Sequence, residues 1–323
     1  MWDGPSGHRK IEAGPPPKLN KQDVDCLYLW QSWDEMYYKA SGYSHPSSAE
    51  AMKRTGANTR FASDPRLRVL DFEKPPVVET SLGFYFTPLS KWNIINYGLL
   101  WQKFMSKYPS AEFKAPIGEM ELSFAPNSDF TNLSLRAFFV DTSKTQLVQI
   151  QNGCFLRNWR KTPETPRYQH YDEVLPIFRE DWLSFAAAMR EISPGELEIK
   201  RCEMTYFNHL VRGEDWTDFS DFEAYYSMWR GAAGLDTLSK LKMTAIATTY
   251  EIPHGTLQIN SQPGIRQMDG KEVVQLTVTA QIIPTKQKNE EFFQCLDRCH
   301  EANVNGFLEF TTEEFQQKWK RKR

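Results

Sequence analysis

Apolar and polar residues alternate over two long stretches of this chain, which is the pattern of a β-strand with one buried face. From Val78 to Phe86, residues that are mainly apolar are separated by Glu79, Ser81 and Gly83. From Val274 to Ile282, Gln or Thr occupies every second position. A sheet built from such strands has one face that is wet or touches something polar. Its apolar face needs helices to cover it.

Helical periodicity appears between the strand-like stretches, and the same order of elements occurs in both halves of the chain. The first half reads as a strand, a helix, three strands with a hairpin return at Asn152-Gly153, and a closing helix. Further turns are expected at His254-Gly255 and Asp269-Gly270. The expected helices span about 90–107, 172–191, 222–229, 289–302 and 312–318, and the expected strands about 78–86, 120–124, 133–139, 147–150, 154–156, 197–208, 243–250, 256–260 and 274–282.

We therefore predict an α+β fold of two tandem strand-helix-(three or four antiparallel strands)-helix units. The sequence leaves open whether the two units share one curved sheet backed by helices or form separate sheets. The units are residues 71–193 and 194–323, after an N-terminal extension of residues 1–70. The prediction rests on element order and not on residue identity. This order is similar to the repeated unit of TATA-binding-protein-like folds, but shared topology does not transfer DNA binding.

The N-terminal extension differs from the rest of the chain. It opens with glycines and a Pro15-Pro16-Pro17 run, which favours an extended chain. A helix over residues 22–40 is predicted because aromatic and apolar residues recur at three- and four-residue spacing. Such a stripe needs a surface to cover, so we predict that it binds a protein partner or a second copy of the chain. The stripe consists of Leu27, Trp30, Trp33 and Tyr37.

Composition excludes several classes of protein. Hydrophobic residues make up 40% and aromatic residues 14%, which is unlike a disordered chain. The formal net charge of -2 gives no overall attraction to nucleic acid or to an anionic membrane. No run of 18 apolar residues and no leader pattern is present, so we expect a cytoplasmic protein. The five cysteines are scattered and lack a CxxC pair, which predicts reduced thiols.

The first candidate site is a ligand site around Asn158, Trp159 and Arg160. An amide, an indole and a guanidinium at a strand end can stack on and hydrogen-bond a planar or anionic ligand. The structural alternative, which we favour, is that Trp159 anchors the following loop on the core while Arg160 pairs with an acid. The full candidate set is Asn158, Trp159, Arg160, Arg167, Tyr168 and Asn208.

Three weaker candidates remain. The basic tail, with Lys318, Trp319, Lys320 and Arg321, would bind nucleic acid by charge and stacking, although such an end is more often solvated. Strand carboxylates would serve a metal-dependent nuclease or hydrolase, but solvated strand faces explain them better. Cys295, Cys299 and His300 fall short of the four ligands of a closed zinc site. We therefore predict no metal and no cofactor. The strand carboxylates are Glu79, Glu119, Glu121, Glu196 and Glu198, with Lys200 completing a Glu-x-Lys pattern.

Several segments resemble a known family. They are Pro75 to Glu79, the Phe155 to Arg160 segment, Tyr168 with Tyr171, and the Tyr206-Phe207-Asn208 strand end. Together they resemble a sporadically distributed bacterial family of uncharacterised proteins, over about residues 72–320. The resemblance implies a cytosolic bacterial protein from mobile or defence-associated genes. It implies no catalytic residues.

The sequence contains no GxxxxGK[ST], GxGxxG, GxSxG or HExxH motif. We therefore predict a non-catalytic binding or interaction protein that takes a protein partner or associates with itself. The alternatives are a metal-dependent nuclease or hydrolase, and a nucleic-acid-binding protein that uses the basic tail.

Overall fold

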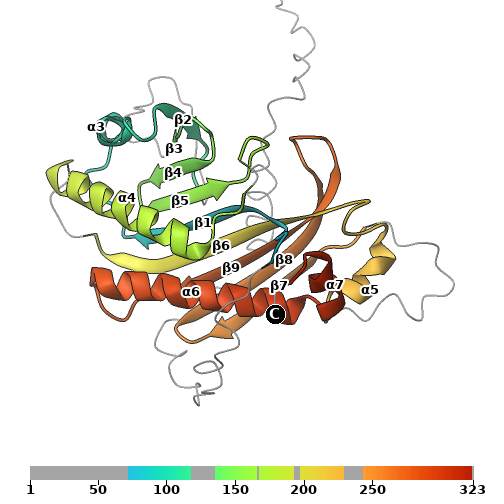
Figure 1. The fold of residues 1–323 in the computed structure, drawn as a ribbon. Helices are drawn as coiled ribbons and strands as arrows, with labels where there is room; N and C mark the ends of the chain where they lie inside the picture. The colour runs from blue at the N-terminus through green and yellow to red at the C-terminus, as the bar shows by residue number, and fades with distance from the viewer. Residues whose placement is uncertain (1–71, 118–134, 166, 193–196, 229–242, 322–323) are drawn as a thin grey trace, which may run out of the picture.

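A single antiparallel sheet organises the part of the chain that the structure describes. The computed structural model describes residues 72–117, 135–165, 167–192, 197–228 and 243–321. The nine strands of these residues lie in the order β2-β3-β4-β5-β1-β6-β9-β8-β7 (Figure 1). They are β1 (Val77–Phe86), β2 (Ser110–Lys114), β3 (Arg136–Val140), β4 (Gln146–Gln151), β5 (Cys154–Arg160), β6 (Ile199–Val211), β7 (Ile246–Ile252), β8 (Gly255–Ile265) and β9 (Glu272–Ile282).

The two central strands, β1 and β6, join the two sides of the sheet. β1 pairs with β5 on one edge and with β6 on the other, and β6 also pairs with β9. Strands from residues 77–160 therefore lie on one side of this seam, and strands from residues 199–282 lie on the other. The predicted α+β class is confirmed, and the tandem-unit interpretation remains a prediction.

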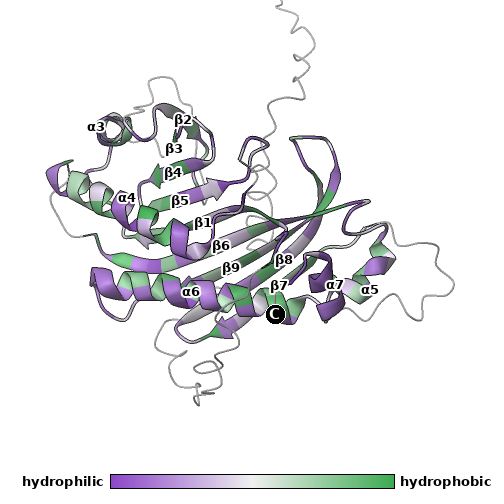
Figure 2. Ribbon diagram, viewed as in Figure 1, coloured by the Kyte–Doolittle hydropathy of each residue, from purple (hydrophilic) through white to green (hydrophobic). Residues whose placement is uncertain are grey.

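Helices cover one face of the sheet, with α4 and α6 running across it in Figure 1. Figure 2 shows hydrophobic and hydrophilic segments alternating along both helices, as expected when one side of a helix packs on a sheet. No helix among the described residues is long and apolar enough to cross a membrane. The helices are α3 (Ile95–Phe104), α4 (Tyr171–Ile192), α5 (Phe222–Tyr225), α6 (Asn289–Phe310) and α7 (Glu313–Lys318).

The main core lies between the helices and the sheet and is largely aromatic. Phe84 from β1 packs edge-on against Phe178 and Trp182 from α4, with ring centroids 5.0 and 4.8 Å away. A smaller apolar cluster of Phe138, Val140 and Leu147 is separate from this core. Because Ala137, Phe139 and Val148 belong to the main core, alternation along β3 and β4 places the smaller cluster on the other face of the sheet. We call this second face the helix-free face, because none of the described helices packs there.

Several elements differ from their expected bounds. β2 was not predicted, and α6 continues eight residues beyond the expected end at residue 302, to Phe310. The expected aromatic helix at 222–229 is the single turn α5. The expected turns are present, with positive φ at Gly153, His254 and Gly270. The predicted helix at 22–40 and strand at 120–124 lie outside the described residues.

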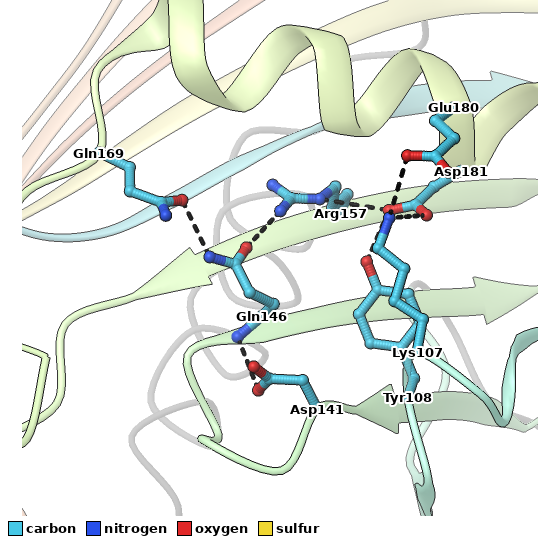
Figure 3. A network of polar contacts seen from close by, with 8 residues as sticks. All are labelled: Lys107, Tyr108, Asp141, Gln146, Arg157, Gln169, Glu180 and Asp181. Atoms are coloured by element: carbon cyan, nitrogen blue, oxygen red, sulfur yellow. Dashed lines mark hydrogen bonds and ion pairs between the residues drawn. The ribbon is translucent and has the colours of Figure 1, made fainter.

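A buried ion-pair network fixes α4 to the sheet (Figure 3). Asp181 of α4 is 2% exposed and Arg157 of β5 is fully buried, and Arg157 Nε lies 3.3 Å from Asp181 Oδ2. The same carboxylate accepts hydrogen bonds of 2.6 Å from Tyr108 Oη and Lys107 Nζ. Burial raises the pKa of Tyr108, so its hydroxyl stays protonated and donates. Gln146 accepts a hydrogen bond from Arg157, so both charged groups have polar partners.

Candidate functional site

A pocket of about 830 Å³ opens at the end of the sheet where β1 begins and β6 ends. Four further segments contribute to its wall: the loop before α4, the turn after β6, the β8–β9 hairpin and the end of α7. We call it the junction pocket. Its volume lies in the range of sites for small ligands. Its charged lining residues are Glu73, Lys74, Lys161, Arg167, Glu214, Asp215, Arg266 and Lys318.

The carboxylates of the junction pocket form ion pairs or hydrogen bonds with other groups of the protein. Glu73 lies 2.8 Å from Lys320, and Glu214 lies 2.6 Å from Lys271. Asp215 accepts hydrogen bonds from the backbone N–H of Val211 at 2.7 Å and from the indole N–H of Trp319 at 3.1 Å. Burial raises the pKa of Asp215, and these hydrogen bonds oppose the shift.

Three ammonium groups of the pocket have no carboxylate within 4.0 Å among the described residues. They belong to Lys74, Lys161 and Lys318. Lys318 Nζ donates instead to two neutral oxygens, the backbone carbonyl of Asp215 at 2.6 Å and the hydroxyl of Tyr225 at 2.9 Å. The two arginines of the pocket differ from the lysines, because Arg167 pairs with Glu173 and Arg266 pairs with Asp269. The pocket therefore carries more positive than negative charge.

His209 at the end of β6 lines the same pocket, and its Nδ1 atom is buried without a hydrogen-bond partner among the described residues. Burial lowers the pKa of His209 to about 4, and the nearby Arg266 guanidinium acts in the same direction. His209 is therefore neutral at physiological pH. Its presence does not add a positive charge to the lysines around it.

The lowered pKa of His209 predicts a loss of stability in mild acid. Between pH 6.5 and 4 the unfolded chain takes up a proton at this residue that the folded chain does not, so falling pH favours unfolding. We expect about 1 to 2 kcal/mol of this loss by pH 5 to come from His209. Urea unfolding at pH 7 and pH 5 should show a smaller difference for His209→Gln than for the wild type. An unchanged difference would exclude this role, since the similarly shifted His300 remains in both proteins.

The structure places four of the predicted site residues at the junction pocket: Arg167, Tyr168, Lys318 and Trp319. Trp319 is 3% exposed and packs against Phe315, with ring centroids 4.3 Å apart, so its ring is not available for a base to stack on. The rest of the predicted basic tail also makes contacts within the chain. Lys320 pairs with Glu73, and Arg321 donates to Gln316.

Asn158 and Arg160 lie elsewhere, on the helix-free face, in a row of hydrogen bonds that we call the amide ladder. Arg136 of β3 donates to Gln149 Oε1 of β4 at 3.2 Å, and Gln149 Nε2 donates to Asn158 Oδ1 at 2.7 Å. Asn158 Nδ2 donates to Glu79 Oε1 of β1 at 2.5 Å. Glu79 Oε2 is also 3.2 Å from Arg160 Nε. The ladder thus crosses four adjacent strands.

The remaining predicted residues serve the core. Trp159 is 1% exposed on the helix-covered face and meets the ring of Tyr168 edge-on at 5.5 Å, which anchors the loop between β5 and α4. Asn208 is 1% exposed and donates to the carbonyl of Leu276. Asn158 and Trp159 therefore point to opposite faces, so the six predicted ligand residues do not form one site. The predicted partner-binding residues Leu27, Trp30, Trp33 and Tyr37 lie outside the described residues.

The residues named for metal or nuclease chemistry are dispersed. Glu119, Glu121 and Glu196 lie outside the described residues. Glu198 contacts Thr87 and Lys200 near the other end of β6. Cys295 and Cys299 are fully buried on α6, and His300 bonds to Tyr206. In the part of the chain that the structure describes, no group of three or more His, Cys, Asp or Glu residues could hold a metal ion.

Sequence reasoning missed Lys74, Lys161, Arg136 and Gln149. Lys74 and Lys161 flank the segments Pro75 to Glu79 and Phe155 to Arg160, but the sequence around a single lysine does not show whether an acid pairs with it. Gln149 and Arg136 alternate with apolar neighbours, which marks their face but not their mutual contact. No protein-family model matches this chain, and no curated protein matches it.

Proposed function

We propose that this protein is a non-catalytic binding protein that holds an anionic ligand in the junction pocket. The observation that carries the proposal is the charge of the pocket, where Lys74, Lys161 and Lys318 have no carboxylate within 4.0 Å among the described residues. Ammonium groups gathered in one concave site attract anions and form charge-assisted hydrogen bonds with them.

The balance of charge in the pocket favours a ligand with two negative charges. The paired acids and arginines cancel, which leaves three lysines and Asp215. With Asp215 ionised, the excess is two positive charges. Phosphate groups and dicarboxylates match that excess, whereas a neutral or cationic molecule would leave the lysines unpaired. The partly exposed aromatic side chains of Phe72 and Tyr168 add apolar surface beside the charges.

Binding of inorganic pyrophosphate tests the proposal. Isothermal titration at constant ionic strength should detect binding to the wild type, and the double change Lys74→Gln and Lys161→Gln should weaken it at least about tenfold, because each lost charge-assisted hydrogen bond costs about 1.5 kcal/mol or more. Salt should weaken binding further, since the attraction is electrostatic.

A matched control is Lys103→Gln combined with Lys200→Gln, which removes the same charge from lysines that pair with Glu191 and Glu198 away from the pocket. We expect pyrophosphate affinity to change less than about twofold in this control. Equal affinity of the pocket variant and the wild type would refute the proposal. Equal weakening in both variants would mean that total charge, and not the pocket, attracts the anion.

The pocket also bears on the predicted organisation of the chain. Its walls come from β1 and the loop after β5 on one side, and from β6, the β8–β9 hairpin and α7 on the other. We propose that residues 71–193 and 194–323 are two tandem units and that the ligand binds where they meet. The nucleic-acid alternative shares Lys318 with this site, and a polynucleotide phosphate would use the same charge.

A further inference from the structure

Arg136 on the helix-free face is a buried cation without an acidic partner among the residues that the structure describes. The residue is 3% exposed, and no carboxylate of the described residues lies within 4.0 Å of its guanidinium. Its one hydrogen bond among the described residues goes to the neutral amide of Gln149, and its Nε atom has no hydrogen-bond partner. Arginine does not lose its proton in proteins, so the charge persists. A buried charge without a counter-ion is strongly unfavourable.

The surroundings of Arg136 add a second cation and only one acid. Both guanidinium groups lie near the ring of Phe138, with the Cζ atoms of Arg136 and Arg160 at 5.0 and 5.9 Å from its ring centroid. The single carboxylate of the amide ladder, Glu79, already contacts Arg160 and Asn158. The ladder therefore holds two positive charges and one negative charge.

Two other arginines of the sheet, the fully buried Arg157 and the partly exposed Arg201, do have acidic partners. Arg157 has Asp181 at 3.3 Å on the helix-covered face. Arg201, on the same helix-free face as Arg136, has Glu203 at 3.6 Å and lies 3.7 Å from the ring centroid of Tyr85. Arg136 resembles Arg201 in its position over an aromatic ring, but it lacks the carboxylate. A carboxylate is therefore the group that would complement Arg136.

We propose that Arg136, Phe138 and Arg160 form a binding site for a carboxylate group of a ligand on the helix-free face. A carboxylate brings one negative charge, which matches the excess of one positive charge, and its two oxygens fit the planar fork of a guanidinium. The amide ladder orients the site, because each amide donates toward Glu79 and leaves the free donors of Arg136 for the ligand. This site shares no residue with the junction pocket.

Acetate is a suitable probe because it is a small carboxylate that carries a single negative charge. Thermal unfolding at pH 7 in about 0.1 M sodium acetate is compared with unfolding in sodium chloride of equal ionic strength, which screens general electrostatics equally. We expect acetate to raise the melting temperature of the wild type by about 2 to 4 °C. The rise should vanish in Arg136→Met and shrink in Arg136→Lys, which keeps the charge but loses the fork.

The Arg136→Met protein should unfold in chloride at a temperature equal to or above that of the wild type, because the variant removes an unpaired buried charge. Arg201→Met serves as the matched control and should keep the acetate shift. A wild type without the shift, an Arg136→Met variant that retains it, or an Arg201→Met variant that loses it would each overturn the proposal.

A pyrophosphate arm separates this proposal from that of the junction pocket. Stabilisation by pyrophosphate should persist in Arg136→Met and disappear in the double variant Lys74→Gln and Lys161→Gln. The rise in melting temperature caused by acetate should disappear in Arg136→Met and persist in the double lysine variant. Loss of both shifts in Arg136→Met would refute a separate carboxylate site. If the lysine variant lost the pyrophosphate shift but kept the acetate shift, the result would support a carboxylate site that is separate from the junction pocket.

Discussion

Replacing Asp181 by alanine is expected to lower the free energy of unfolding by about 3 to 5 kcal/mol. The change leaves the fully buried guanidinium of Arg157 without its carboxylate and removes the acceptor of Tyr108 and Lys107. A charge that stays in the core without a partner costs far more than the pair itself contributes. Urea unfolding followed by circular dichroism measures the loss.

The control for this experiment is Glu191→Ala, which removes the partner of Lys103 from the same helix. That ion pair spans 2.8 Å, but its side chains are 50% and 66% exposed, so we expect a change of less than about 1 kcal/mol. The double variant Arg157→Met with Asp181→Leu should recover most of the stability, because it removes both charges together. If Asp181→Ala were as mild as Glu191→Ala, water or another group would have to reach Arg157.

The ion pair at Asp181 has a consequence for the junction pocket. It holds α4 on β5, and the loop that contributes Lys161, Arg167 and Tyr168 to the pocket leads directly into α4 at Tyr171. Weakening the anchor should therefore loosen one pocket wall before the sheet itself unfolds. The buried network in Figure 3 thus positions one wall of the junction pocket, although none of its charged residues lines that pocket.

The strands and helices were largely predictable because their patterns are local. The alternation in Val274–Ile282 and the turn at Asn152-Gly153 each depend on a few neighbouring residues. β2 escaped prediction because Ser110–Lys114 is an edge strand whose side chains are mostly exposed, so no buried face imposes alternation. The helix expected at 222–229 is longer than α5, because the aromatic residues after β6 have helical spacing but form only a single helical turn.

The site was less predictable because its contacts join residues that are far apart in the sequence. Asn158, Trp159 and Arg160 were singled out together, but adjacent residues of a strand point to opposite faces, so Trp159 cannot share a site with Asn158 and Arg160. The excess charge at the junction pocket arises because Lys320 and Lys271 neutralise Glu73 and Glu214, and that cancellation depends on the fold. Sequence identifies the charged residues, whereas only the structure shows which ones remain unpaired.

The second large effect is expected at Gly83 in the middle of β1. A Cβ atom at this position would lie 2.2 Å from the carbonyl oxygen of Phe155 and 2.8 Å from the Cα atom of Leu156, both in the backbone of β5. β1 is paired on both edges, with β5 and with β6, so it cannot move aside without breaking hydrogen bonds to one of them. We therefore expect Gly83→Ala to lower the free energy of unfolding by about 3 kcal/mol or more.

Gly98→Ala is the matched control, because the same methyl group is added in α3 where no atom lies within 4 Å. Alanine is the better helix former, so this variant should gain about 0.5 to 1 kcal/mol. β1 carries Glu79 of the amide ladder and leads from the junction pocket, so Gly83→Ala should also weaken the binding of both probes at temperatures below its unfolding transition. Full stability of Gly83→Ala would show that β1 and β5 can separate at no cost, which contradicts the close pairing on which both sites depend.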